Sequence, residues 1–207
     1  MGAFIVSHIP IVRQVFATVN TLIHESGHAI AALLTSGKVY SVSLFLNSEG
    51  LAQTGTRSWL SKFIVSYAGY TFSSAIAFIS FYFISTGRTA VIFYGLFTLA
   101  IINLLFWIRN VYGILWLFGF LGFCLYIEYN QLSALKEHFT LFVACIVLIQ
   151  SVSTSFAVLY LSLIQPSRAG DATNLAKLTF IPATLWGFVF FGQSIVVLYY
   201  VFTLFII

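Results

Sequence analysis

The sequence predicts an all-α polytopic membrane protein, because its composition is strongly apolar and several apolar runs are long. Of the 207 residues, 60% are hydrophobic and 7% are charged, and the mean hydropathy is +1.02. A soluble domain carries about 25% charged residues. The apolar runs reach the length of about 20 residues that a helix needs to cross a bilayer. We expect one membrane-embedded domain over residues 1–207, with about six transmembrane helices and a small membrane-associated β-hairpin after the first.

The expected spans are separated by short polar segments, which also carry the topology signal. The spans cover about residues 11–34, 63–85, 89–108, 111–129 and 139–164, and a last one runs from after Lys177 to the C-terminus, broken near its start by Pro182. The loops after the odd-numbered spans hold most of the basic residues, namely Lys38, Arg57, Lys62, Arg109, Arg168 and Lys177. The other loops hold only Arg88 and Lys136. Because basic loops stay in the cytoplasm, both termini are expected on the outer side.

The segment at about residues 38–57 is too polar and too short to span the membrane. Its apolar and polar residues alternate from Tyr40 to Asn47, which predicts a strand, and residues 47–50 have turn chemistry. Leu51–Thr54 then returns as a second strand. An extended substrate can add to the free edge of such a hairpin. A plain surface hairpin is the alternative, and the sequence leaves both open.

The first span contains the most informative stretch, His24-Glu25-Ser26-Gly27-His28, which has the form H-E-x-x-H. Residues four apart lie on one face of a helix, so His24 and His28 can offer two imidazoles to one metal ion. Glu25 is placed to act as general base on a metal-bound water. Chance produces this pattern in roughly one such chain in a thousand.

The same span carries a polar stripe on one face. Its members recur three or four residues apart and are Gln14, Thr18, Thr21, Glu25 and His28. Such a stripe faces the interior of a helix bundle or a water-filled cavity, because exposure to lipid is costly. His24 lies about 20 Å along the span, which predicts a metal at the cytoplasmic depth of the membrane.

A catalytic zinc usually takes a third protein ligand. The candidates on the same side are Glu49 in the hairpin and Asp171, the only aspartate in the chain. Asp171 stands at the start of a helical pattern, so its alternative role is a helix N-cap or an exposed loop residue. From the residues alone these alternatives stay open.

The chain resembles the site-2 protease class of intramembrane zinc metallopeptidases, especially the short branch without PDZ or CBS domains. The resemblance rests on the H-E-x-x-H stretch, on Gly50–Thr54 and Tyr67–Tyr70, and on Gly170–Thr179 with Pro182. It implies that His24, His28 and Asp171 bind one zinc ion and that Glu25 is the base. Better-known members have glycine after this aspartate, whereas Ala172 follows it here.

These observations predict a zinc-dependent intramembrane endopeptidase that hydrolyses peptide bonds of membrane-associated substrates. The expected partners are a membrane-protein or peptide substrate and the lipid bilayer, but no nucleic acid, because the basic residues are scattered. We expect a multi-pass protein of a bacterial plasma membrane, and the positive-inside distribution puts the active site toward the cytoplasmic side. The alternative is a non-catalytic membrane protein, either a transporter or an inactive metal-binding homologue, in which polar residues of the fifth and last spans line a path.

Overall fold

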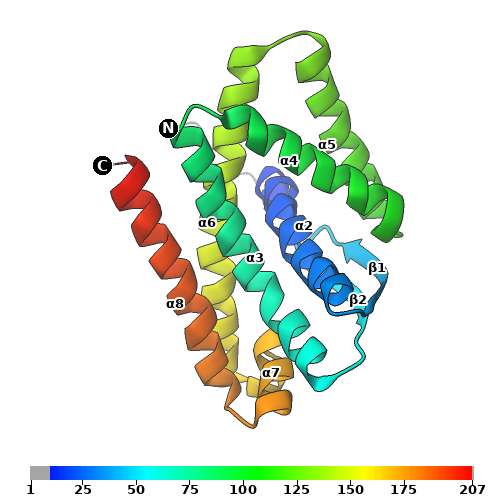
Figure 1. Ribbon diagram of the computed structural model, residues 1–207, viewed down its shortest axis with the longest axis vertical. Coiled ribbons are helices and arrows are strands. Elements are labelled where there is room, and N and C mark those ends of the chain that lie inside the picture. Colours follow the sequence, from blue (N-terminus) through cyan, green and yellow to red (C-terminus); the bar gives the residue numbers. More distant parts are fainter. Residues whose placement is uncertain (1–9, 207) are drawn as a thin grey trace.

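The computed structural model describes residues 10–206, which form a helical bundle with one two-stranded hairpin (Figure 1). The elements in chain order are α2 (Pro10–Leu34), β1 (Lys38–Leu44), β2 (Gly50–Gly55), α3 (Trp59–Ser85), α4 (Thr89–Ile102), the π-helical turn η1 (Asn103–Trp107), α5 (Val111–Tyr129), α6 (Ser133–Ile164), the 3-10 turn η2 (Pro166–Arg168), α7 (Asp171–Thr179), α8 (Ala183–Val201) and the π-helical turn η3 (Phe202–Ile206). The predicted fold class, with its hairpin after the first long helix, is confirmed.

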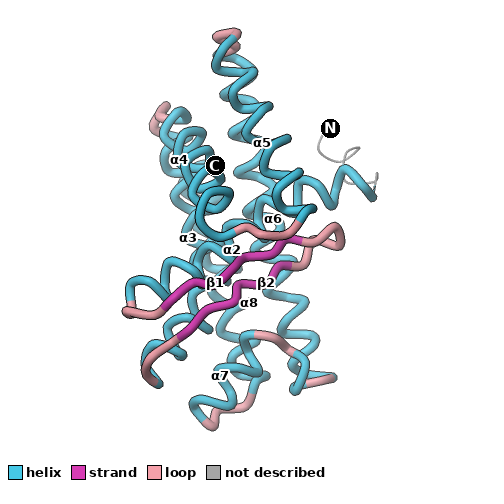
Figure 2. Tube along the Cα trace, turned by 90° about the vertical axis from the view of Figure 1, so that its right-hand side faces the viewer, coloured by secondary structure: helices cyan, strands magenta, loops and turns pink. Residues whose placement is uncertain are grey.

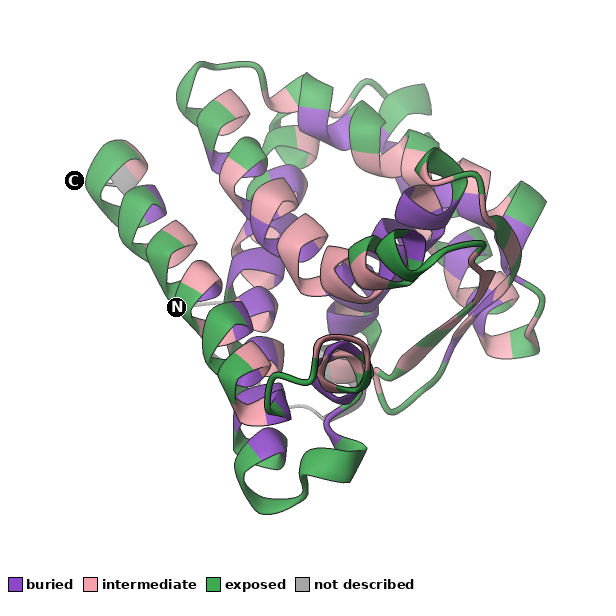
Figure 3. Ribbon diagram, turned by 60° about the horizontal axis from the view of Figure 1, so that its bottom comes forward, coloured by how far each residue is buried: buried purple, intermediate pink, exposed green. Residues whose placement is uncertain are grey.

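Among the described helices, five are long and apolar enough to cross a membrane. They are α3, α4 with η1, α5, α6, and α8 with η3. Helix α2 has 25 residues, which is also a sufficient length. Its polar stripe lowers its hydropathy, and the bundle provides polar partners for that stripe. The outer faces of α5 and α8 are largely exposed, as expected for helices that face lipid (Figure 3).

Helix α2 lies inside the bundle, packed mainly against α3 and α6 and covered by the hairpin (Figure 1). Small residues allow the close approach of α2 and α3. A Cβ atom at Gly27 would be 2.7 Å from Cβ of Phe72, so only glycine fits there. Two buried apolar side chains of α2, Val19 and Ile23, pack with residues of α3, α6 and α8 in one core cluster.

The hairpin lies between the α4–α5 pair and α7, with β1 toward the former and β2 toward the latter (Figures 1 and 2). Its strands pair antiparallel from Lys38–Gly55 to Leu44–Gly50, with one bulge between Val39 and Ser41. The turn is fixed on α2, because Thr21 Oγ1 donates a hydrogen bond to the carbonyl oxygen of Ser48 at 2.7 Å.

Helix α7 is short, and buried contacts hold it in place. Ala169, Ala172 and Leu175 are fully buried in a cluster with Phe190 of α8. Trp59 Nε1, at the start of α3, donates to the carbonyl oxygen of Leu178 at 2.8 Å. These contacts bring the start of α7 beside the middle of α2.

Candidate active site

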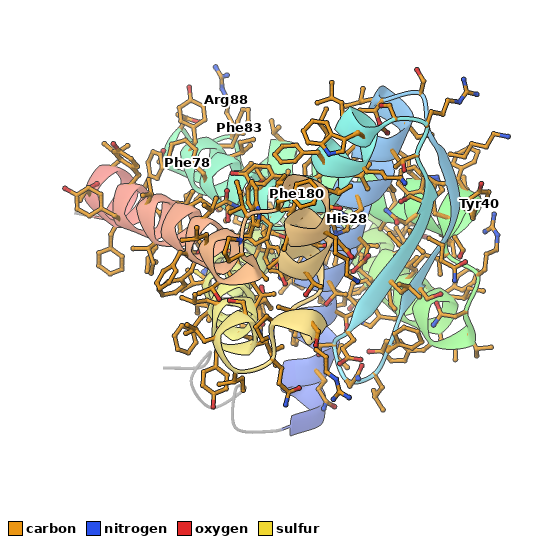
Figure 4. The ribbon with its side chains drawn as sticks, turned by 90° about the horizontal axis from the view of Figure 1, so that it is seen from below. His28, Tyr40, Phe78, Phe83, Arg88 and Phe180 are labelled. Carbon is orange, nitrogen blue, oxygen red and sulfur yellow. The ribbon has the colours of Figure 1, made fainter. Side chains whose placement is uncertain are left out.

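Helix α2 presents His24, Glu25 and His28 toward α7 and the hairpin. The regular helix runs through the motif without interruption, so the two histidines lie on one face, one turn apart. Their ring centroids are 4.8 Å apart. Glu25 and His28 are buried, and His24 is partly exposed. Seen from below, His28 lies between α7 and the hairpin (Figure 4).

A hydrogen bond from α3 determines which nitrogen of His28 is free. His28 Nδ1 lies 2.6 Å from the carbonyl oxygen of Val65. A carbonyl oxygen only accepts, so Nδ1 carries the proton and donates it. In the neutral imidazole the lone pair is then on Nε2, which faces the site, and this is the arrangement found behind metal-binding histidines.

Asp171 joins the two histidines from the other end of the chain. Its Oδ2 lies 3.4 Å from Nε2 of His24 and 3.2 Å from Nε2 of His28. Those two nitrogens are 3.1 Å apart. Although Asp171 is the first residue of α7, no side-chain cap was found at that terminus, and Gly170 occupies the N-cap position. The carboxylate points to the histidines instead.

These three atoms match one face of a zinc coordination tetrahedron. Zinc binds imidazole nitrogen and carboxylate oxygen at about 2.0–2.2 Å, which places neighbouring tetrahedral ligands about 3.3–3.5 Å apart. The separations of 3.1–3.4 Å are close to this spacing. Two imidazoles and one carboxylate are also a ligand set that catalytic zinc uses. The residues present therefore fit a zinc ion with one open position.

Helix α3 backs this cluster with a glycine and an aromatic ring. A Cβ atom at Gly69 would be 2.6 Å from Nε2 of both histidines, so no other residue fits against them without displacement. The adjacent Tyr70 meets His24 edge to face, with ring centroids 4.6 Å apart, and also packs against Phe190. Together they set the orientation of the His24 ring.

The start of β2 covers Glu25. A Cβ atom at Gly50 would be 2.6 Å from Cγ and Oε1 of Glu25 and 2.6 Å from Thr21. The backbone amide of Ala52 also faces this carboxylate. Glu25 is thus buried between α2 and the hairpin, on the same stripe as the histidines. This places a candidate base beside the cluster.

The electrostatics of Asp171 suit a cation ligand. Burial on its own would raise the pKa of this carboxyl group. When His28 and His24 are protonated, their attraction and the hydrogen bonds that they donate outweigh the effect of burial and hold the pKa of Asp171 below its ordinary value. Asp171 is therefore ionised at neutral pH, and an ionised carboxylate is the form that binds a metal.

The structure brings together four of the five residues that the sequence singled out. His24, His28 and Asp171 are the group of potential metal ligands found among the described residues, and Glu25 adjoins them. Glu49 is exposed in the hairpin turn and does not belong to the group. Sequence reasoning did not assign Gly50, Gly69 and Tyr70 to the site. The sequence did contain a signal for the two glycines, since both fall in stretches that carry the family resemblance.

The comparisons with known proteins assign the chain to a family. The sequence model of the Peptidase M50B-like family matches residues 1–201. The fold and this match define a membrane-embedded peptidase. The chain belongs to the Peptidase M50B-like family, within the site-2 protease family of intramembrane zinc metallopeptidases. Searches of the curated proteins and of the solved structures found no match.

Proposed function

We propose that the protein is a zinc-dependent endopeptidase that hydrolyses peptide bonds of membrane-associated substrates. The observation that supports this most is the triangle of His24 Nε2, His28 Nε2 and Asp171 Oδ2, whose sides are 3.1–3.4 Å, with Glu25 beside it. Family membership supports the same chemistry.

In the proposed reaction, the zinc ion held by these three residues would supply a water of lowered pKa and polarise the scissile carbonyl group. Glu25 accepts a proton from the water as its oxygen bonds to the carbonyl carbon. Glu25 then gives that proton to the amide nitrogen as the carbon–nitrogen bond breaks. Its burial under Gly50 keeps bulk water away from the proton while it is transferred.

A transmembrane substrate has to unwind before it is cut, because a helix keeps its backbone groups hydrogen-bonded internally. The hairpin offers a place for the unwound segment, since β2 is the strand on the α7 side of the hairpin (Figure 2). The main chain of Gly50 and Ala52 lies beside Glu25. Addition of the substrate as a strand along β2 would bring its backbone to the base.

We place the protein in a bacterial plasma membrane, and the distribution of basic residues supports an orientation with the active site toward the cytoplasm. The loops predicted on that side include the hairpin and the α4–α5 turn, and these contact each other through Leu44 and Asn110. The partners in this proposal are the bilayer and a membrane-protein or peptide substrate.

The test combines capture, cleavage and metal analysis. The Glu25→Gln variant, expressed in membranes, should retain substrates, which mass spectrometry then identifies. On such a substrate the wild type should cleave, while Glu25→Gln should be slower by at least about a hundredfold. Both should hold about one zinc per chain, and Glu49→Gln serves as the control. Equal rates for wild type and Glu25→Gln would reject the mechanism.

The alternative of a non-catalytic transporter receives no support from the polar residues of α6. Ser151 Oγ, Ser153 Oγ and Thr154 Oγ1 donate to carbonyl oxygens of the preceding turn of their own helix. Ser155 pairs with Ser194 of α8 at 2.7 Å and is buried. These hydroxyl groups have partners within the bundle and need no aqueous path.

A further inference from the structure

Residues 103–110, which we call the 103–110 segment, connect the metal-binding helix to the hairpin. The segment begins with the π-helical turn Asn103–Trp107 at the end of α4. The Asn103 side chain is fully buried, and its Nδ2 donates to Ser26 Oγ at 2.8 Å. Ser26 directly follows Glu25 in the chain. One end of the segment is therefore anchored on the H-E-x-x-H turn of α2.

The other end of the segment closes the outer edge of β1. Asn110 Nδ2 donates to the carbonyl oxygen of Leu44 at 2.5 Å, and Oδ1 accepts from the amide of Leu44 at 3.2 Å. The amide side chain thus replaces a neighbouring strand at this residue. Two residues earlier on β1, Val42 forms a parallel bridge with Ile108. At these two residues the outer edge of β1 is therefore already hydrogen-bonded and cannot pair with an added strand.

The side-chain hydrogen bonds of Asn110 are unusual for a residue at the N-cap of a helix. Asn110 is the N-cap residue of α5, where asparagine normally accepts from amides of the first turn. Here no side-chain cap hydrogen bond is formed, and both polar groups of the side chain go to Leu44. Gly113 makes room for this arrangement, because a Cβ atom there would be 2.7 Å from Oδ1 of Asn110.

The contact is transmitted across the hairpin to Glu25. In an antiparallel pair, residues whose N–H and C=O point outward stand opposite each other. The main-chain N–H and C=O groups of Leu44 point outward to Asn110. The same groups of its partner Gly50 therefore point outward on the opposite edge of the hairpin, which is the free edge of β2. Gly50 also lies against Glu25. Asn110, together with the hydrogen bond from Thr21 to Ser48, therefore sets the position of the β2 edge relative to the candidate base.

We propose that Asn110 is a positioning residue that selects which peptide bond of a bound strand reaches Glu25, acting through Leu44 and Gly50. This inference rests on the proposed peptidase function. If Asn110 no longer holds Leu44, the hydrogen bond from Thr21 to Ser48 still ties the turn to α2, but the paired residues Leu44 and Gly50 lose their support from the 103–110 segment and shift more widely relative to Glu25. A bound strand then settles in more than one register, and shifts of two residues keep the same side chains on each face.

The test uses zinc-loaded protein in detergent micelles and a library of defined apolar peptides of about 20 residues. Cleavage sites are mapped by mass spectrometry of the products. For Asn110→Ala we expect the zinc content of the wild type, a KM raised roughly tenfold and a nearly unchanged kcat. Products should spread from the main cleavage site to bonds two residues away. Gly113→Ala, which displaces the Asn110 side chain, should give the same spread.

Asn130→Ala is the matched control, because Asn130 is an exposed asparagine at the other end of α5 whose amide bonds only within its own turn. It should cleave as the wild type does. Unchanged KM and cleavage sites in Asn110→Ala would overturn the inference while leaving the peptidase function in place.

Hydrogen exchange separates the two proposals if no peptide is cut. A wild type that cleaves nothing counts against the peptidase function. The contact between Asn110 and Leu44 is then tested by hydrogen exchange alone. The Leu44 amide loses its acceptor in Asn110→Ala and should exchange faster. Asn130→Ala should leave the exchange rate of that amide unchanged. Unaltered exchange at Leu44 in Asn110→Ala would overturn the inference about Asn110 independently of activity.

Discussion

Gly69 of α3 stands so close to His28 of α2 that a Cβ atom on it would be 2.6 Å from Nε2 of that histidine. The same atom would be 2.5 Å from Cε1 of His24. Real Cβ atoms do not approach other heavy atoms this closely, so the two rings would have to move. Because the spacing of the two nitrogens matches that of zinc ligands, movement of either ring breaks the match.

The first prediction follows from this contact. Gly69→Ala should weaken zinc binding by at least about tenfold, since the added methyl group pushes the ligand nitrogens out of position. Zinc content after dialysis against graded chelator measures the change. Gly95→Ala is the matched control, because Gly95 lies in another membrane helix with open space at its Cβ position. Wild-type zinc affinity in Gly69→Ala would contradict the packing described here.

Gly50→Ala is expected to separate catalysis from metal binding. Its methyl group would contact Glu25, with a Cβ atom 2.6 Å from Oε1. The Glu25 side chain is flexible and can turn away, and a displacement of about 1 Å can cost roughly a hundredfold in rate. We expect kcat to fall about 10- to 100-fold while zinc content stays at the wild-type level. Parallel loss of zinc would show that the methyl group acts on the ligands instead.

Much of the fold follows from local sequence patterns, and for that reason it was predictable. Apolar runs predicted the spans, a period of two predicted the strands around Asn47–Gly50, and the H-E-x-x-H spacing placed His24 and His28 on one face. Each of these signals is contained in a short window. The bounds of the hairpin, Lys38–Gly55, accordingly fall within the predicted 38–57.

The parts that sequence left open depend on contacts between distant segments. Asp171 reaches the histidines because Ala172 and Leu175 bury α7 against α8, and no local pattern reports that packing. The structure shows that alanine after the aspartate is accommodated, since Ala172 is fully buried in this cluster. Gly50 and Gly69 were visible as glycines, but what each one approaches is a property of the assembled bundle.

Asp171→Asn tests the contribution of the third side chain. The amide keeps the size of the carboxylate but lacks its charge, and a neutral oxygen is a weaker ligand. We expect zinc affinity to fall by at least about tenfold, measured by competition with a fluorescent chelator. Glu49→Gln, which also removes one carboxylate charge, should bind zinc as the wild type does because Glu49 is exposed outside the cluster. Equal losses in both variants would point to a general effect of charge.

Asn103→Ala should destabilise the bundle by more than the loss of one average hydrogen bond. Asn103 is fully buried and donates from Nδ2 to Ser26 Oγ and to the carbonyl oxygen of Leu99, both within 2.9 Å. Its Oδ1 has no partner among the described residues. Hydrogen bonds inside membranes contribute about 0.6 kcal/mol on average, and the alanine also leaves a cavity. We expect a loss of about 1–3 kcal/mol in the free energy of unfolding, measured by denaturant titration in mixed micelles.

The comparison with Asn103→Leu identifies the cause of that loss. Leucine is larger but has the same branching at Cγ, and it removes the unpaired Oδ1 together with the donor, so replacing the polar group by an apolar one recovers part of the stability. Asn103→Leu should therefore unfold between the wild type and Asn103→Ala. If packing alone mattered, leucine would match the wild type. If the bond to Ser26 were dominant, leucine would be as unstable as alanine, and the anchoring of the H-E-x-x-H turn would depend on that bond.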